Sequence, residues 1–289
     1  MARLITPYHS SCSGRPKTKE VIPLGVEYRE LGRTHERVST VGMGTWGMGT
    51  YRSGEERAAQ VAALQRGIEL GMNLIDTAEV YAGGRSEEVV RDAVQGRRDA
   101  VFIATKVSRD NLTHDALLAA CDRSLARLGT RWIDLYQVHW PNPTVPITET
   151  MNAMEELVGA GKVRYIGVSN FSVQQTKEAR QALSKSDLAS NQVEYSLSNR
   201  SVEAGVLPYC AKEGVSLIAY SPLARGQIDR SIPGELLQRY GMTEAQAMLN
   251  WVTRREHVLA IPKASDLRHV EENASSVSVR FEQGEYETM

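Results

Sequence analysis

The feature that most constrains the fold is a regular alternation of short apolar runs with longer segments of helical periodicity, which begins near residue 37. The runs are rich in Val, Ile and Tyr, which is typical of buried strands. Eight such runs occur, at Val38–Gly42, Met72–Ile75, Val101–Thr105, Ile133–Val138, Val163–Val168, Ser190–Tyr195, Val215–Tyr220 and Val258–Ile261. Because helical crossovers separate the runs, the sequence predicts parallel pairing of the strands.

The helical segments support a closed barrel. They are predicted at Glu55–Leu70, Ser86–Val94, Thr113–Leu128, Ile147–Gly159, Ser172–Leu183, Ser201–Lys212, Thr243–Arg254 and Ser265–Glu272. Thr113 is a predicted N-cap, and Gly71 and Gly129 are predicted to end two of the helices. Eight strand–helix units in about 250 residues favour a single-domain (β/α)8 TIM barrel of the α/β class. An open doubly wound sheet is the competing interpretation.

The segment Gly42–Gly47 matches the GxGxxG pattern that would support the open sheet. In a dinucleotide-binding domain this turn opens directly into a helix, whereas here residues 48–54 intervene before the helical pattern starts. The acid that follows, Asp76, is 29 residues beyond Gly47 rather than about 20. We therefore interpret these glycines as positions of close backbone packing at a barrel rim.

Composition excludes several classes of partner and structure. With 34 Lys and Arg against 35 Asp and Glu, the formal charge of −1 gives no reason to expect a nucleic acid or an anionic membrane as partner. Cys12, Cys121 and Cys210 form no CxxC pair, so neither a disulfide framework nor a metal site is predicted, and a cytoplasmic location is the simplest expectation. Residues 1–25 are interpreted as an N-terminal extension, with a transit peptide as the alternative.

Polar side chains follow the predicted strands where a barrel enzyme carries its catalytic groups. Asp76 and then Tyr81 follow the second strand, Lys106 the third and His139 the fourth. A neighbouring ammonium lowers the pKa of a phenol, so we expect Tyr81 beside Lys106 to exchange a proton with a developing alkoxide. Asp76 would keep Lys106 charged, and His139 would orient a carbonyl oxygen. This set of groups suits carbonyl reduction, although a plain stabilising ion pair would also explain Asp76 and Lys106.

These residues lie in motifs that resemble the aldo-keto reductase superfamily over about residues 27–281. The matching segments are Asp76–Tyr81, Ala104–Lys106, Leu135–Trp140, Gly161–Phe171, Asn191–Ser196 and Ile261–Ser265. Tyr28–Arg33, followed by Val38, resembles an N-terminal hairpin that closes the bottom of the barrel. The domain is accordingly predicted to span residues 26–289.

The resemblance implies NADPH-dependent reduction of an aldehyde or ketone, with Asp76, Tyr81, Lys106 and His139 as catalytic residues. It implies that Tyr220 stacks on the nicotinamide and that Ser169, Asn170 and Gln192 bind its carboxamide. Lys263, Ser265 and Arg268 would hold the 2′-phosphate at the start of a helix. The full set of expected cofactor residues is Gly44, Thr45, Trp46, Asp76, Ser169, Asn170, Gln192, Tyr220, Ser221, Leu223, Gly226, Ile261, Lys263, Ala264, Ser265, Arg268, Glu272 and Asn273.

The chain departs from the resemblance in ways that affect specificity. His269 stands where many relatives carry Arg, so use of NADH beside NADPH is an open alternative. The segment Ala224–Gly241 and the tail after Asn273 are short, which predicts an open substrate pocket walled by Trp46, Tyr81, His139 and Trp140.

Two further interpretations stay open within the resemblance. One is an NADPH-binding regulatory module with little turnover, similar to the β subunits of potassium channels. The other is a reductase of carbon–carbon double bonds, a branch that carries Glu where this chain has His139. The expected partner is a small carbonyl compound, and the default expectation for assembly is a monomer, with an oligomer not excluded.

Overall fold

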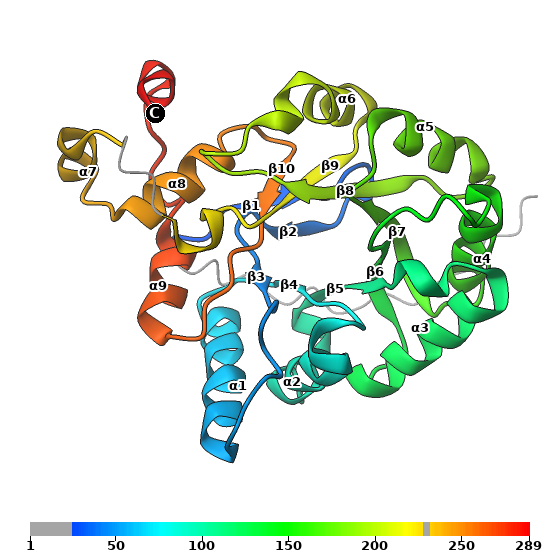
Figure 1. Cartoon of the computed structure of the whole chain (residues 1–289). Coiled ribbons are helices and arrows are strands. Elements are labelled where there is room, and N and C mark those ends of the chain that lie inside the picture. The colour runs from blue at the N-terminus through cyan, green and yellow to red at the C-terminus, as the bar shows by residue number, and fades with distance from the viewer. Residues whose placement is uncertain (1–24, 228–231) are drawn as a thin grey trace, which may run out of the picture.

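The chain forms a closed barrel of eight parallel strands surrounded by helices (Figure 1). The computed structural model describes residues 25–227 and 232–289. The barrel strands are β3 (Met43–Gly44), β4 (Leu74–Asp76), β5 (Phe102–Val107), β6 (Ile133–Val138), β7 (Val163–Ser169), β8 (Leu188–Glu194), β9 (Ser216–Tyr220) and β10 (Val258–Ala260). Each pairs with its neighbour in sequence order, which confirms the (β/α)8 prediction. The predicted extension lies outside the described residues, apart from Gly25.

The barrel closes between its first and last strands. Parallel bridges join Val41 to Ala260 and Gly44 to Lys263. A Cβ on Gly44 would lie 2.5 Å from the carbonyl oxygen of Ile261, and one on Gly42 would lie 2.8 Å from Leu74. Gly42 and Gly44 therefore allow the close approach of β3 to its two neighbours, as predicted for the barrel rim, whereas nothing lies within 4 Å of a Cβ added at Gly47. The closed barrel shows that the open-sheet interpretation is wrong.

The first predicted strand was placed too early in the chain. Residues Arg37–Ser39 form β2, which pairs antiparallel with β1 (Tyr28–Glu30) in a separate hairpin. The barrel strand itself is the two-residue β3, which follows a bend at Thr40 and the single bridge of Val41 to Ala260. The sequence pattern merged the two because only three residues separate them and Val38, Val41 and Met43 are all buried, although Val38 packs inside the barrel and Met43 packs outside it against α1.

Four of the nine described α-helices begin at side chains that satisfy free backbone N–H groups. Ser53, Ser172, Thr243 and Asp266 each accept a hydrogen bond from the first turn of the helix that follows. Thr113 occupies an N-cap position without such a bond. The helices are α1 (Gly54–Glu69), α2 (Arg85–Ala93), α3 (His114–Leu128), α4 (Ile147–Gly159), α5 (Val173–Ala182), α6 (Val206–Glu213), α7 (Gly234–Tyr240), α8 (Glu244–Val252) and α9 (Leu267–Ser275).

Short 3-10 segments complete the chain and include the differences from prediction. They are η1 (Tyr81–Gly84), η2 (Arg98–Ala100), η3 (Arg109–Asn111), η4 (Ser201–Ala204), η5 (Ala224–Gly226) and η6 (Gln283–Thr288). The predicted helix Ser201–Lys212 is divided at Gly205 into η4 and α6. Neither α7 nor η6 was predicted, and they lie beside each other at the edge of the molecule through hydrogen bonds from Tyr240 to Glu285 (Figure 1).

The hairpin of β1 and β2 closes the end of the barrel where the strands begin. Its Leu31 and Val38 are fully buried and pack with Leu74, Leu135 and Ile218 inside the barrel. This hairpin is the one that the resemblance implied would close the bottom of the barrel. Over the described part of the chain, no helix is long and apolar enough to cross a membrane.

We predict that Gly32 in the hairpin tolerates no side chain. Gly32 has φ +55°, and an added Cβ would lie 2.5 Å from the carbonyl oxygen of Ala189. Gly241 is the matched control, because its φ is +60° and nothing lies within 4 Å of an added Cβ. Gly241→Ala should lower the free energy of unfolding by about 1–2 kcal/mol, the cost of the left-handed backbone. Gly32→Ala should lose a further ~1–3 kcal/mol from overpacking. Equal losses in urea unfolding would contradict the predicted clash.

Candidate active site at the carboxyl end of the barrel

Four polar side chains from consecutive parts of the barrel converge at the carboxyl ends of the strands. Asp76 ends β4, Lys106 lies on β5, Tyr81 opens η1 and His139 follows β6. The Lys106 Nζ lies 2.6 Å from Asp76 Oδ1 and 3.3 Å from the Tyr81 hydroxyl. The Tyr81 and His139 rings meet edge to face, with centroids 5.7 Å apart. The sequence placed these residues on separate strand ends, and the barrel brings all four together.

The Asp76–Lys106 pair is enclosed by further hydrogen bonds. Lys106 is fully buried and Asp76 is 2% exposed, so each charge needs partners inside the protein. Lys106 also donates to the carbonyl oxygen of Thr77 at 2.8 Å. The second carboxylate oxygen of Asp76 accepts from Gln192 Nε2 at 2.7 Å and from Gln137 Nε2 at 3.4 Å. The pair is therefore held by charge-assisted contacts from four strands.

Gln137 is a site residue that the sequence analysis missed. It lies on β6 two residues after Leu135 and two before His139. Side chains two apart on a strand point to the same face, and Leu135 is part of the barrel interior. That alternation was the available signal that Gln137 also points inward.

Burial and neighbouring charges determine the protonation of the Lys106 ammonium and the Tyr81 phenol. Burial alone would lower the pKa of Lys106, but the Asp76 carboxylate and Tyr81 together raise it above its usual value. Burial raises the pKa of Tyr81, and Lys106 only partly opposes this. The expectation that Lys106 makes Tyr81 more acidic overall is therefore wrong, because desolvation of the phenolate outweighs the nearby ammonium. Tyr81 is a protonated phenol at neutral pH.

His139 is held neutral. Burial lowers the pKa of its imidazole to about 3, and the Lys106 charge adds to the shift. A neutral imidazole has one N–H donor and one acceptor nitrogen. His139 can thus donate a hydrogen bond to a carbonyl oxygen without competing as a proton source.

The predicted carboxamide-binding residues form one connected cluster. Asn170 Nδ2 donates to Ser169 Oγ and to the His139 carbonyl oxygen, both at 3.0 Å. The Tyr220 hydroxyl donates to Asn170 Oδ1 at 3.0 Å. Gln192 reaches the same region with its Nε2 committed to Asp76, so its Oε1 is the atom suited to accept from a bound amide. Asn170 sits in the left-handed region, at φ +63°, which fixes its side chain at the rim.

Several other predicted cofactor residues have their side chains engaged within the fold. Thr45 is fully buried, and its hydroxyl donates to the Asp76 carbonyl oxygen and accepts from Ser86. Ile261 points into the barrel interior. The loop after β9 turns sharply, with positive φ at Ser221 and Gly226, while Leu223 packs against the core.

The predicted phosphate end differs from expectation in one respect. Lys263 and Arg268 are exposed at the start of α9, with Ser265 partly buried between them. However, the Asp266 carboxylate already accepts from the backbone N–H groups of Arg268 and His269. We had expected the start of the helix to be free to bind a phosphate. Because Asp266 occupies it, only the side chains near the helix start could hold a phosphate there.

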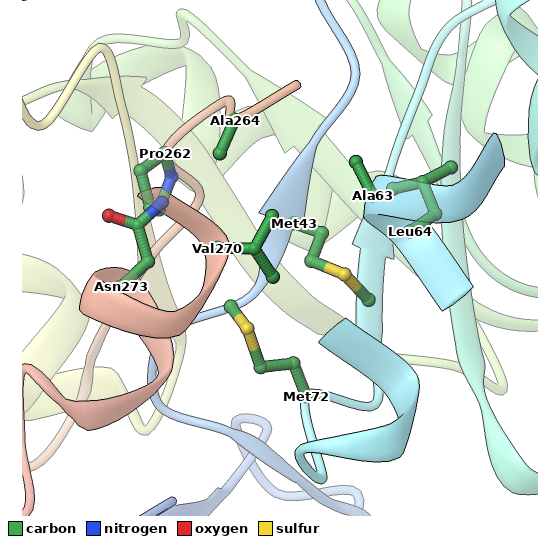
Figure 2. Close-up of a pocket in the computed structure, with 8 residues that line it drawn as sticks. All are labelled: Met43, Ala63, Leu64, Met72, Pro262, Ala264, Val270 and Asn273. Carbon is green, nitrogen blue, oxygen red and sulfur yellow. The ribbon is translucent and has the colours of Figure 1, made fainter. Parts of the chain in front are cut away.

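A small apolar cavity lies beside this region, between β3, α1 and α9 (Figure 2). Its volume of about 10 Å³ is no more than one water molecule needs. It is lined by Met43, Ala63, Leu64, Met72, Pro262, Ala264, Val270 and Asn273. The predicted adenine-side residue Asn273 is buried in its wall, whereas Glu272 is only partly buried. The cavity is a packing gap rather than a ligand site.

The mouth of the site is open. Trp46, on the loop after β3, is 65% exposed, and Trp140, next to His139, is 45% exposed. The C-terminal segment η6 packs instead against α7 and α8, where Trp251 Nε1 donates to the Tyr286 carbonyl oxygen. In the described residues the tail leaves both tryptophans uncovered, and the open substrate pocket stays a prediction.

Comparison with known proteins places these features in a family. Residues 40–235, about two thirds of the chain, match the model of the aldo/keto reductase family. The methylglyoxal reductase YeaE of Escherichia coli is 40% identical over 251 residues, which cover 85% of this chain and 87% of that protein. The crystal structure of the thermostable aldo-keto reductase Tm1743 with the inhibitor epalrestat has a TM-score of 0.86 at 39% identity, covering 90% of this chain and 97% of that one.

A second solved structure carries a cofactor. The aldo/keto reductase of Klebsiella pneumoniae in complex with NADP and acetate has a TM-score of 0.81 at 38% identity, covering 89% of this chain and 92% of that one. Fold and likeness together define an α/β-barrel oxidoreductase. The chain belongs to the aldo/keto reductase family, as its motifs predicted.

Because His139 is neutral in the folded protein, we predict that it makes the free energy of unfolding depend on pH. Its pKa is about 3 when folded and near 6.5 when exposed, so below pH 6.5 only the unfolded chain takes up this proton. As pH falls from about 6 to about 4, wild type should lose about 1.4 kcal/mol more per pH unit than His139→Gln. Urea unfolding at several pH values measures this difference. Parallel stability curves would contradict the neutral assignment.

Proposed function

We propose that this protein reduces aldehydes or ketones to alcohols with NADPH, with Tyr81 as the proton donor. The observation that carries the proposal is the Tyr81 hydroxyl 3.3 Å from a buried ammonium, beside the edge of a neutral imidazole. The family and the E. coli relative named as a methylglyoxal reductase support carbonyl reduction in general.

The reaction needs a proton at the carbonyl oxygen when a hydride reaches the carbonyl carbon. The raised pKa of Tyr81 keeps its proton available at neutral pH. As that proton moves to the substrate oxygen, a phenolate develops next to Lys106, whose charge then stabilises it. Asp76 holds Lys106 in place at 2.6 Å and keeps it charged. His139 would donate its single N–H to the same carbonyl oxygen and so set the orientation of the substrate.

The residues at the rim fit a reduced nicotinamide cofactor, which when bound supplies the hydride. Tyr220 offers a ring face and Gln192 an Oε1 suited to accept from an amide, while the Ser169 hydroxyl and the Asn170 amide would exchange their present hydrogen bonds for bonds to the carboxamide. Lys263 and Arg268 are exposed cations that suit a 2′-phosphate, which supports NADPH over NADH. The NADP complex of the Klebsiella pneumoniae relative supports the same choice.

Two alternatives have distinguishable outcomes. A regulatory module would bind NADPH without aldehyde-dependent loss of its absorbance. A carbon–carbon double-bond reductase would consume NADPH with an enone but not with an aldehyde, and the neutral His139 argues against this branch, which carries Glu there. A panel of methylglyoxal, simple aldehydes, aromatic aldehydes and an enone, each with NADPH and NADH, separates the three.

Replacing Tyr81 with Phe tests the proton donor. Tyr81→Phe should reduce kcat by at least about 10²- to 10⁴-fold, because general acid catalysis is lost. NADPH binding, followed by fluorescence titration, should be retained. Tyr165→Phe is the matched control, since this hydroxyl bonds Glu36 at the opposite end of the barrel, and it should keep wild-type turnover. If Tyr81→Phe turns over normally, the proposed role of the phenol is wrong.

Replacing Lys263 tests the phosphate assignment. Lys263→Met should weaken NADPH binding by about 10- to 100-fold, the value of one charge-assisted contact, and change NADH binding little. Lys185→Met, on the loop before β8 at the other end of the barrel, is the control and should change neither. If Lys263→Met weakens the binding of NADPH and NADH equally, Lys263 does not bind the 2′-phosphate.

A further inference from the structure

We propose that Glu79 is a positioning residue that holds the Tyr81 hydroxyl against Lys106. Glu79 lies between Asp76 and Tyr81 in the sequence, on the segment 77–84 that we term the Tyr81 loop. It reaches the segment 108–111, the β5 loop, which follows the strand that carries Lys106. The inference rests on the proposed role of Tyr81 as proton donor.

The contacts of Glu79 join these two loops directly. Its Oε1 accepts a hydrogen bond from the backbone N–H of Ser108 at 2.6 Å and one from Asn111 Nδ2 at 3.0 Å. Its own backbone N–H donates to the carbonyl oxygen of Lys106 at 3.2 Å. Glu79 therefore binds the chain at three points: the Lys106 backbone, the Ser108 backbone and the Asn111 side chain. A carboxylate that accepts backbone and amide N–H groups makes a strong and directional tie.

The Tyr81 loop needs such a tie because its backbone is strained. Three consecutive residues after Tyr81 have positive φ, at +50° for Ala82, +65° for Gly83 and +92° for Gly84. For Ala82 this conformation costs about 1–2 kcal/mol, which the surroundings must offset. Tyr81 itself donates its backbone N–H to the Ala78 carbonyl oxygen at 3.1 Å, a bond within the loop that does not join it to the barrel.

The distance that Glu79 controls is sensitive to small movements. The Tyr81 hydroxyl is 3.3 Å from Lys106 Nζ, near the long end of hydrogen bonding, so a modest outward shift would break the contact. The charged and titratable groups that face Tyr81 are Lys106, Asp76, His139 and, across the mouth, Tyr220. Of these, only Lys106 lowers the pKa of the Tyr81 phenol. Because so small a shift keeps the ring in its buried site, losing the Lys106 contact should raise the pKa of Tyr81 and leave the developing phenolate unsupported.

The test compares Glu79→Ala with Glu79→Gln. Glutamine keeps an Oε1 that can accept both hydrogen bonds, whereas alanine removes both acceptors. Glu79→Ala should lower kcat by about 10- to 100-fold, in line with the cost of misplacing a reacting group. It should leave the Kd for NADPH within about twofold of wild type, because the tie involves neither Asn170 nor Gln192. Glu79→Gln should stay within about threefold of wild-type kcat.

The pH profile distinguishes positioning from general loss of structure. In the reducing direction Tyr81 must be protonated, so kcat falls above its pKa. Glu79→Ala should move that alkaline limb to higher pH, since the phenol loses the influence of Lys106. The matched structural control is Glu87→Gln: Glu87 is a fully buried carboxylate that binds Thr105 and Arg127. This variant should lower the thermal midpoint while its alkaline limb stays in place.

Several outcomes would overturn the inference. Wild-type kcat and pH profile in Glu79→Ala would do so, as would Glu79→Gln being as impaired as Glu79→Ala. If Glu79→Ala does not fold, Asn111→Ala removes one of the two bonds from the other side and should lower kcat and shift the alkaline limb by smaller amounts. No shift in Asn111→Ala would then refute the role. An active Tyr81→Phe refutes the proposed function itself, whereas an inactive Tyr81→Phe beside an unaffected Glu79→Ala refutes only the positioning role.

Discussion

The buried ion pair between Lys106 and Asp76 is the constraint around which the rest of the site is arranged. A fully buried ammonium is costly unless its charge and its N–H groups are matched. The barrel supplies the match from neighbouring strands: the carboxylate from β4, the Thr77 carbonyl just beyond it, and amide donors to that carboxylate from β6 and β8. The pair itself joins the adjacent strands β4 and β5, whereas the Gln192 contact from β8 reaches across the barrel and depends on its curvature.

Burial and the charge of Lys106 together set the protonation of the two neighbours: they oppose each other at Tyr81, where burial prevails, and act in the same direction at His139. Burial raises the pKa of Tyr81 and lowers that of His139, while the Lys106 charge lowers both. The outcome is a phenol that keeps its proton and an imidazole that does not gain one. A hydrogen-bond donor and a proton donor can therefore face the same carbonyl oxygen with distinct roles. The proposed tie from Glu79 fits this picture, since the balance depends on a contact of 3.3 Å.

The two ends of the barrel differ in how their charges are used. At the hairpin end, Arg164 pairs with Asp134 and with Glu36, so charge there stabilises the fold. At the carboxyl end, Lys263 and Arg268 are exposed, and among the described residues the nearby Asp266 carboxylate binds backbone N–H groups rather than these cations. Such exposed cations at the rim of the site are suited to bind the phosphate of a cofactor. The tail packs on α7 and α8, which leaves the substrate side open.

The sequence by itself determined the class of fold, the order of the strands and the family, because alternating apolar runs and local motifs depend on residues close together in the chain. It also indicated Asp76, Tyr81, Lys106 and His139, each at the end of a run. Only the tertiary structure decided what depends on burial and on contacts between distant residues. These are the raised pKa of Tyr81, the Gln137 and Gln192 bonds to Asp76, the Asp266 cap and the position of the first barrel strand. Desolvation and strand registry are properties of the folded barrel, and no local pattern of residues encodes their magnitude.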